Sequence, residues 1–314
     1  MNRSFFIIGA IAVLAAGLML THLVTNAYVF YAGFVALQYV VISTGWNILG
    51  GYAGYVNFGS GAFVGLGMYA AVFLFKAIDA PLVVQILGAA VAGGVLGLGM
   101  GYLTLRIQGV FFSIATLALT IVLNTIIVNW SFVGGARGIA VLAPPPTLFP
   151  SIVSYVFFAM LVLAVLSIAA ARWIEKSWIG RGLAALRADE QAAECSGTPT
   201  LKLKLFAATV SGALIASAGA PYPYYASYVE PASAFGLAIA LNALAMPLIG
   251  GTRSWIGPLV GALLLSGLEQ AATVTIPTEV NLLIVGLVLI GFVVAAPDGL
   301  LGLIDRRPVK GRRS

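Results

Sequence analysis

The chain has 314 residues, of which 61% are hydrophobic and 8% charged, and its net charge is +6. A soluble domain carries about 25% charged residues, so this composition excludes one, and the scattered cations argue against a nucleic-acid-binding surface. One cysteine, Cys195, excludes an intrachain disulfide, and with one histidine, His22, we expect no metal site.

Apolar runs recur along the whole chain, each close to the roughly 20 residues that cross a bilayer as a helix. The sequence therefore predicts an all-α, polytopic bundle that forms one transmembrane domain over residues 1–314. The first run is interpreted as a retained span, because no clear small-residue cleavage site follows it. The ten predicted spans cover residues 5–24, 28–49, 59–76, 81–105, 110–130, 152–173, 203–220, 234–251, 255–271 and 279–296.

The distribution of Lys and Arg predicts the orientation of these spans. An even number of spans places both termini on one side, and the positive-inside rule selects the cytoplasm. In that orientation 14 cations lie inside, and only Lys76 and Arg137 lie outside. The inner set is Arg3, Arg106, Arg172, Lys176, Arg181, Arg187, Lys202, Lys204, Arg253, Arg306, Arg307, Lys310, Arg312 and Arg313.

The segment from Gly45 to Gly67 is rich in glycine and carries Asn47 and Asn57. Glycine admits unusual backbone angles, and a broken helix within a membrane is tolerated only in protein or beside a water-filled cavity. This pattern predicts a broken, internal segment near a translocation path. Close helix packing through small residues is the alternative for individual glycines.

A second stripe of small residues lies in the span over 81–105. Ala89, Gly93, Gly97 and Gly101 recur at every fourth position, so they share one helix face. This spacing is typical of close helix–helix contact, and we predict packing rather than a ligand site.

The inner loop at 173–204 is long and holds nine of the 26 charged residues of the chain. Within it, residues 182–196 predict a single short amphipathic helix that ends at Gly197. Leu183, Leu186 and Ala193 are available for one face of that helix. The helix is either a connector on the membrane surface or a docking element for a soluble partner.

Two charged residues of this loop, Arg187 and Glu190, lie three positions apart and are spaced to pair. An exposed pair of this kind contributes little to stability.

Ionisable groups are scarce within the predicted spans. Transport driven by protons or sodium usually needs such groups, and Glu269 and Arg106 lie toward span ends. The polar candidates inside spans are neutral: Gln38, Asn47, Asn57, Asn124 and Asn242. The sequence contains no P-loop, paired carboxylates or Ser/His/Asp set, so we expect no catalytic residue. Any active transport would take its energy from another chain.

Several segments together resemble the permease subunits of bacterial ABC importers for branched-chain amino acids, of the type paired with a second, related permease. The matching segments are NILGGYAGYVNFGSGAFVGLGMYAA, GVFFSIATLAL, IGRGLAALRADEQAAECSGTP, PLIGGTRSWIGPLVGA and APDGLLGL. The resemblance extends nearly from end to end.

The resemblance implies a permease of about ten spans in the bacterial cytoplasmic (inner) membrane. It implies a heterodimer with the related permease, two cytoplasmic ATPase subunits that bind the ATP, and an extracytoplasmic substrate-binding protein. No cofactor is then expected on this chain, and its other contacts are with lipid.

The inner loop then becomes the element that couples the permease to the ATPases. The coupling residues by this resemblance are Arg181, Gly182, Arg187, Asp189, Glu190, Ala193, Glu194 and Gly197. Arg187 would pair across the ATPase interface, and Ala193 would lie where only a small side chain fits. The candidate translocation-path residues are Asn47, Asn57, Gly59, Asn242, Gly250 and Gly251.

The chain departs from the family pattern at Cys195, Ser196, Thr198 and Pro199, at Thr252 and Arg253, and at Asn242. These departures do not change the expected coupling role. They leave the transported solute undetermined, because the resemblance also extends to importers of urea, short amides, aromatic acids and other small carboxylates. A sugar or nucleoside ABC permease is the first alternative. A stand-alone channel, a secondary transporter and a structural membrane scaffold are the others.

Overall fold

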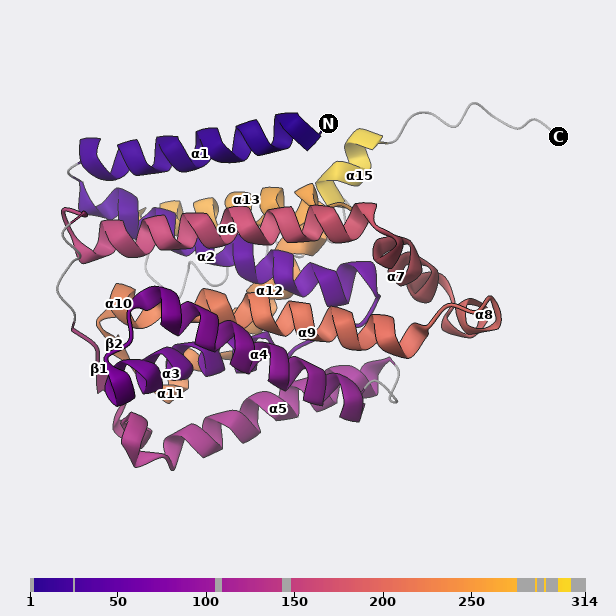
Figure 1. Cartoon of the computed structure of the whole chain (residues 1–314), viewed down its shortest axis with the longest axis horizontal. Coiled ribbons are helices and arrows are strands. Elements are labelled where there is room, and N and C mark those ends of the chain that lie inside the picture. Colours follow the sequence, from indigo (N-terminus) through magenta and orange to yellow (C-terminus); the bar gives the residue numbers. More distant parts are fainter. Residues whose placement is uncertain are drawn as a thin grey trace.

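The computed structural model describes residues 3–24, 26–104, 109–142, 148–275, 286, 291 and 299–305. Long helices lie side by side and form a bundle (Figure 1). They are α1 (Arg3–Leu23), α2 (Ala27–Asn47), α3 (Ser60–Ile78), α4 (Leu82–Thr104), α5 (Val110–Val128), α6 (Ile152–Lys176), α9 (Thr200–Gly219), α12 (Leu237–Gly250) and α13 (Ile256–Thr275).

Shorter elements connect these helices. They are η1 (Ile48–Tyr52), η2 (Ser131–Val133), η3 (Gly135–Arg137), α7 (Trp178–Ala188), α8 (Glu190–Cys195), α10 (Tyr222–Ala226), α11 (Pro231–Ala234) and α15 (Gly299–Asp305). Two short antiparallel strands, β1 (Ile139–Ala140) and β2 (Tyr228–Val229), pair at one end of the bundle. The α7–α8 pair projects from the opposite end (Figure 1).

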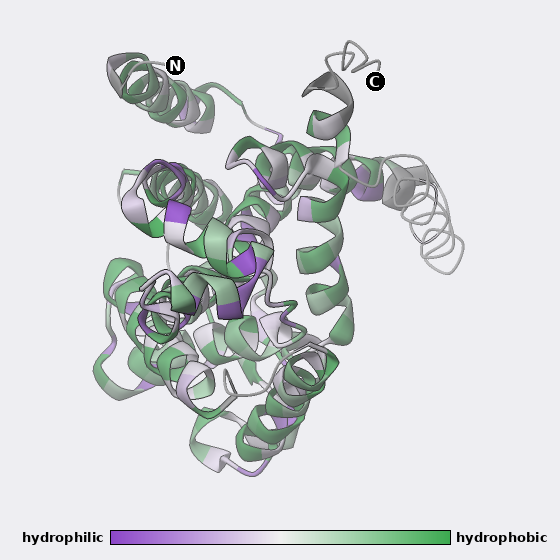
Figure 2. Ribbon diagram, turned by 90° about the vertical axis from the view of Figure 1, so that its right-hand side faces the viewer, coloured by the Kyte–Doolittle hydropathy of each residue, from purple (hydrophilic) through white to green (hydrophobic). Residues whose placement is uncertain are grey.

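The all-α, membrane-spanning fold is confirmed. In the described part of the chain, eight helices are long and apolar enough to cross a membrane, and a shorter apolar helix covers Ile256–Ala271. Nine of the ten predicted spans therefore coincide with helices. The tenth, 279–296, lies outside the described residues apart from 286 and 291. Hydrophobic residues dominate the long helices (Figure 2), and large apolar side chains such as Ile11, Val91 and Ile121 are exposed on them, as a lipid environment requires.

The small residues of α4 allow it to pack closely along α9, which confirms the predicted packing stripe. A Cβ atom added at Gly93 would lie 2.4 Å from the Gly212 carbonyl oxygen. One added at Gly97 would lie 2.4 Å from the Ala208 carbonyl oxygen. The two backbones are thus nearly in contact, which only glycine permits.

We expect Gly67→Ala to destabilise the purified protein by about 1–3 kcal/mol, the usual effect of overpacking. A Cβ at Gly67 would lie 1.9 Å from the Ala216 carbonyl oxygen, so α3 and α9 would have to separate. Gly99→Ala is the matched control, because nothing lies within 4 Å of its added Cβ. The measurement is thermal unfolding in detergent, and equal midpoints for the two variants would contradict this packing.

The glycine-rich segment is a broken helix, as predicted. α2 continues into the π-helical turn η1, and the chain then runs without regular structure until α3 begins at Ser60. Gly54 has φ +82°, a left-handed conformation that favours glycine. The Trp46 Nε1–H donates to the Asn57 carbonyl oxygen at 2.7 Å, which holds the irregular stretch against the end of α2.

The inner loop differs from its prediction in one respect. The single helix expected over 182–196 is two helices, α7 and α8, separated by Asp189 with an extended backbone at φ −162° and ψ 115°. The Asp189 carboxylate accepts a hydrogen bond from the Ala192 N–H at 3.0 Å, and this N-cap stabilises the start of α8. Gly197, at φ +79°, ends the pair as predicted.

Candidate functional site

The end of the bundle that carries α7 and α8, the predicted coupling loop, is called the coupling end, and it is positioned by the end of α6. Ser177 follows the last residue of α6, and its hydroxyl accepts hydrogen bonds from the N–H groups of Ile179 and Gly180 at 3.1 and 3.4 Å. This N-cap starts α7 directly after α6. Leu183 and Leu186 are buried at 0% and 4% exposure, so one face of α7 is fixed on the bundle.

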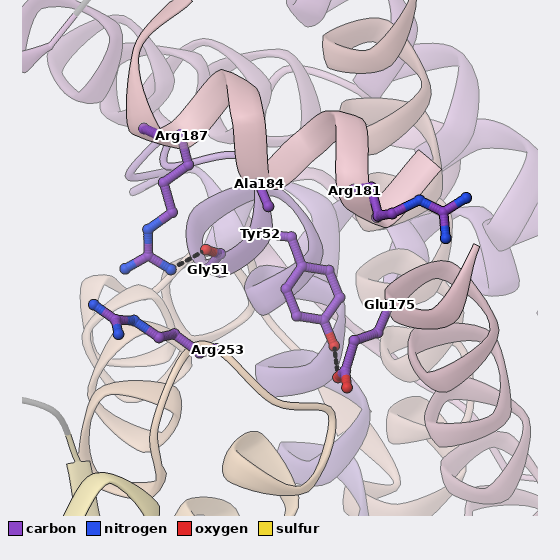
Figure 3. Close-up of a pocket in the computed structure, with 9 residues that line it drawn as sticks. Gly51, Tyr52, Glu175, Arg181, Ala184, Arg187 and Arg253 are labelled. Atoms are coloured by element: carbon purple, nitrogen blue, oxygen red, sulfur yellow. Dashed lines mark hydrogen bonds between the residues drawn. The ribbon is translucent and has the colours of Figure 1, made fainter. Parts of the chain in front are cut away.

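A cleft of about 580 Å³ lies between α7 and the end of the bundle (Figure 3). Three arginines and one carboxylate line it: Arg181, Arg187, Arg253 and Glu175. The excess of positive charge suits an acidic partner surface.

Arg187 ties α7 to the break in the second helix. Its Nη1 donates to the Gly51 carbonyl oxygen in η1, and the guanidinium lies 3.4 Å from the Thr252 hydroxyl in the α12–α13 turn. Burial, and then the neighbouring Arg253, lower the pKa of Arg187 below its usual value. One side chain of α7 therefore contacts two separate parts of the membrane domain (Figure 3).

Glu175, near the end of α6, makes a second tie to the same region. Its Oε2 accepts a hydrogen bond from the Tyr52 hydroxyl at 3.2 Å and one from the Trp255 backbone N–H at 2.6 Å. Glu175 thus joins η1 to the turn that precedes α13.

A third tie involves a buried ion pair between Glu190 of α8 and Lys204 of α9, whose side chains are 19% and 4% exposed. The Tyr55 hydroxyl donates to the second Glu190 oxygen at 2.5 Å, and the Lys204 ammonium lies 5.0 Å from the centroid of the Tyr55 ring. Burial, and then Glu190 itself, raise the pKa of Tyr55 above its usual value, so the hydroxyl stays protonated and donates.

Together these ties fasten residues 51–55 to α6, α7 and α8. Gly51, Tyr52 and Tyr55 all belong to the broken segment, and each contacts a different element of the coupling end. A displacement of α7–α8 would therefore pull on the break in the membrane domain. We call residues 51–55, with Arg187, Glu175, Glu190 and Lys204, the coupling cluster.

The other predicted coupling residues have structural positions of their own. Gly182 packs on Leu203, whose Cδ1 would lie 2.6 Å from an added Cβ, and Glu194 accepts from the Thr200 hydroxyl at 2.6 Å. Arg181 and Asp189 are exposed. The exposed surface of the pair mixes small, polar, aromatic and charged residues, among them Ala185, Gln191, Ala192 and Cys195 with Trp178, Arg181 and Asp189.

One expectation for the coupling loop needs correction. Ala193 is 4% exposed, and Arg187 is exposed but donates to Gly51, so the role of both residues at a partner interface stays a prediction. The spacing of Arg187 and Glu190 predicted a pair, but α7 ends between them, and they bond to Gly51 and Lys204 respectively.

Most of the predicted path residues make close backbone contacts. Asn57 is 0% exposed, and its Oδ1 accepts from the Gly59 N–H at 2.7 Å where α3 begins. A Cβ at Gly250 would lie 1.8 Å from the Gly257 carbonyl oxygen, and Gly251 has φ +116°. These contacts give the residues a packing role at the helix junctions, and their role in a path stays a prediction.

Asn47 is 1% exposed, at the last position of α2. Its amide oxygen lies against Gly51, where an added Cβ would come within 1.9 Å. Any larger residue at position 51 would therefore collide with it.

Asn242 has a different setting, because it contacts Glu269, the ionisable group that the sequence placed toward a span end. Its Nδ2 donates to Glu269 Oε1 at 3.1 Å and to the Tyr39 hydroxyl at 3.2 Å, so one amide joins α2, α12 and α13. Tyr39 also lines a cavity of about 140 Å³. The other residues that line it are Gln38, Ile42, Val64, Met68, Tyr222, Ser233 and Ile239.

Sequence reasoning missed Tyr52, Tyr55 and Glu175, and it counted Lys204 only as a topology signal. One signal was available, because GGYAGY places two aromatic hydroxyls three residues apart in a segment otherwise suited to close packing. Glu175 lay just beyond the predicted span, whereas α6 extends through it to Lys176.

Comparison with known proteins agrees with this architecture. The family model described as "Branched-chain amino acid transport system / permease component" matches residues 28–293. The high-affinity branched-chain amino acid transport system permease proteins LivM of Salmonella typhimurium and Escherichia coli are each 26% identical over 294 residues, 85% of this chain and 68% of theirs.

The autoinducer 2 import system permease protein LsrC of Yersinia pestis is 29% identical over 239 residues, 74% of this chain and 66% of its own. No solved structure shows a significant match. Because the family model spans most of the chain, this protein belongs to the family of permease components of branched-chain amino acid transport systems.

Proposed function

We propose that the protein is the permease subunit of an ATP-driven importer for branched-chain amino acids or related small polar or carboxylate solutes. The matches to LivM cover 85% of the chain against 74% for LsrC, which favours amino acids. The similarity to an autoinducer 2 permease supports the alternative of a different small polar solute.

The observation that carries this proposal is the coupling cluster. A projecting helix pair lies beside an arginine-lined cleft and is tied to a break in a membrane helix. This arrangement suits a surface that receives a mechanical input from two separate ATPase subunits. The remaining proposed partners are a second, related permease and an extracytoplasmic binding protein, and this chain contributes no catalytic group.

The proposal is tested by reconstituting the complete complex and measuring uptake of radiolabelled leucine into vesicles. We expect this uptake to require both ATP and the binding protein. We also expect unlabelled valine or isoleucine to compete with the labelled leucine. Uptake without ATP would favour a channel or secondary transporter. ATP-driven uptake of sugars but of no amino or carboxylic acid would favour the alternative ABC permease.

The proposed orientation places the coupling end and both termini in the cytoplasm. Cys195 is the single cysteine of the chain, and it is exposed in α8. We expect a membrane-impermeant maleimide to label it in inside-out vesicles and to leave it unlabelled in intact spheroplasts, with Cys195→Ser as the control for specificity. Labelling of Cys195 in intact spheroplasts would reverse the orientation.

For the path, we propose that Asn242, with Glu269 and Tyr39, faces the solute. We expect Asn242→Leu to reduce uptake by about tenfold at normal expression, because Glu269 loses its amide donor inside the membrane domain. Asn57→Leu is the comparison, since its Oδ1 holds the start of α3 and its loss should lower the unfolding temperature. Wild-type uptake by Asn242→Leu would contradict this assignment.

A further inference from the structure

The first helix leaves a groove against the bundle. α1 packs mainly on α6 and stands apart from the other helices (Figures 1 and 2). Between the N-terminal part of α1 and the C-terminal part of α6 lies a pocket of about 490 Å³. Its residues come only from these two helices and the Ser177 that follows α6.

One end of this pocket is cationic. Arg172 and Lys176 lie four residues apart on the same face of α6, and both line the pocket. The Arg172 guanidinium is held 4.2 Å from the Phe6 ring centroid and 5.7 Å from that of Trp255, so its position is fixed by packing. The nearby carboxylate of Glu175 is directed to Tyr52 and the Trp255 N–H.

The other end of the pocket is apolar. Phe6, Ile7 and Ala169 form this wall, and it continues into the exposed apolar surface of α1, where Ile7 and Ile11 are 49% and 61% exposed. Trp173 also lines the pocket and is 61% exposed. Tryptophan beside cations at a helix end marks the level of the lipid head groups.

A cationic end at head-group level joined to an apolar groove matches one kind of ligand. A soluble anion would complement the positive charge of Arg172 and Lys176 but would leave the apolar wall uncovered. A neutral phospholipid would cover the wall but would add its own cation beside the two side chains. An anionic phospholipid complements both ends, and basic pockets between membrane helices on the cytoplasmic side recognise such head groups.

We propose that this pocket binds an anionic phospholipid, with its phosphate at Arg172 and Lys176 and an acyl chain in the groove between α1 and α6. The binding is independent of the transported solute, and its place on the cytoplasmic side rests on the proposed orientation. It also explains how α1, which makes few contacts with the bundle, is held beside α6.

The test is retention of lipid by the purified complex. The complex is incubated in detergent with phosphatidylglycerol, phosphatidylcholine or inorganic phosphate, and bound lipid is measured by native mass spectrometry together with the unfolding temperature. We expect phosphatidylglycerol to be retained and to raise the unfolding temperature, and the other two to do neither. Equal effects of inorganic phosphate would overturn the proposal in favour of a simple anion site.

Two variants separate the two ends of the site. Lys176→Gln should reduce phosphatidylglycerol retention by about fivefold, the factor expected for one cation near a head group. Ile7→Trp should reduce it by filling the groove without changing the charge. Lys202→Gln is the control, because Lys202 is an exposed cation of α9 outside the pocket, and this variant should retain phosphatidylglycerol as the wild type does. Unchanged retention in both Lys176→Gln and Ile7→Trp would overturn the proposal.

Discussion

Glu190→Ala is expected to lower the free energy of unfolding by about 3 kcal/mol, the low end of the range for removing one partner of a buried ion pair. Lys204 is only 4% exposed on its side chain, and without Glu190 its cation would be left against the Tyr55 ring. Glu190 itself is 19% exposed, which is why the lower value is expected. Thermal or urea unfolding of the purified protein measures the effect.

A double variant, Glu190→Leu with Lys204→Met, tests whether the ion pair is the source of this effect. Replacing a buried pair with apolar residues of similar size is often neutral, so the double variant should recover most of the lost stability. Glu194→Ala is the matched control, because that carboxylate is exposed and bonds only the Thr200 hydroxyl among the contacts described, which limits its effect to about 1 kcal/mol. A double variant no more stable than Glu190→Ala would show that the pair is not the source of the effect.

Arg187→Gln is expected to leave the ATPases bound and to reduce transport by about tenfold. A hydrogen bond from a charged group contributes about 1.5–3 kcal/mol, and the lower end applies because the guanidinium is partly exposed. Such a loss weakens the tie between α7 and Gly51 by about tenfold. Co-purification of the ATPases, their stimulated ATP hydrolysis and solute uptake are measured together.

The comparison variant is Arg181→Gln, six residues earlier on α7 and directed away from Gly51 (Figure 3). It removes the same charge from the same cleft without touching the tie to η1. If both variants lose transport equally with the ATPases still bound, the charge of the cleft rather than the Arg187 contact is responsible. If Arg187→Gln transports normally, the tie has no role in coupling.

The sequence was sufficient for the parts of this fold that depend on local pattern. Apolar runs of about 20 residues predicted the long helices because only helices satisfy backbone groups inside lipid. The glycines between Gly45 and Gly67 predicted the break, because a continuous helix has no need of them at that density. The split between α7 and α8 was missed because Asp189 tolerates a helix but forms a better cap, and tertiary contacts decide between these states.

The contacts of the coupling cluster could not be predicted from local sequence patterns. Gly51 and Arg187 are 136 residues apart, and Tyr55 and Glu190 are 135 apart, so the contacts exist only after the bundle has formed. Glu269 was placed near a span end, whereas α13 continues beyond it to Thr275 and gives it Asn242 as a partner. Charge counting drew attention to the inner loop, but it does not distinguish the cations that contact the bundle, such as Lys204, from those that are exposed.

The most direct measurement for the coupling role uses Cys195, the single cysteine, which lies exposed at the end of α8. A benzophenone maleimide attached there is photoactivated in the assembled complex, and the products are separated and identified by mass spectrometry. If α7–α8 is the ATPase-coupling surface, the main product joins this chain to an ATPase subunit and is absent in Cys195→Ser. Products that join it only to lipid, to the second permease or to the binding protein would contradict that role.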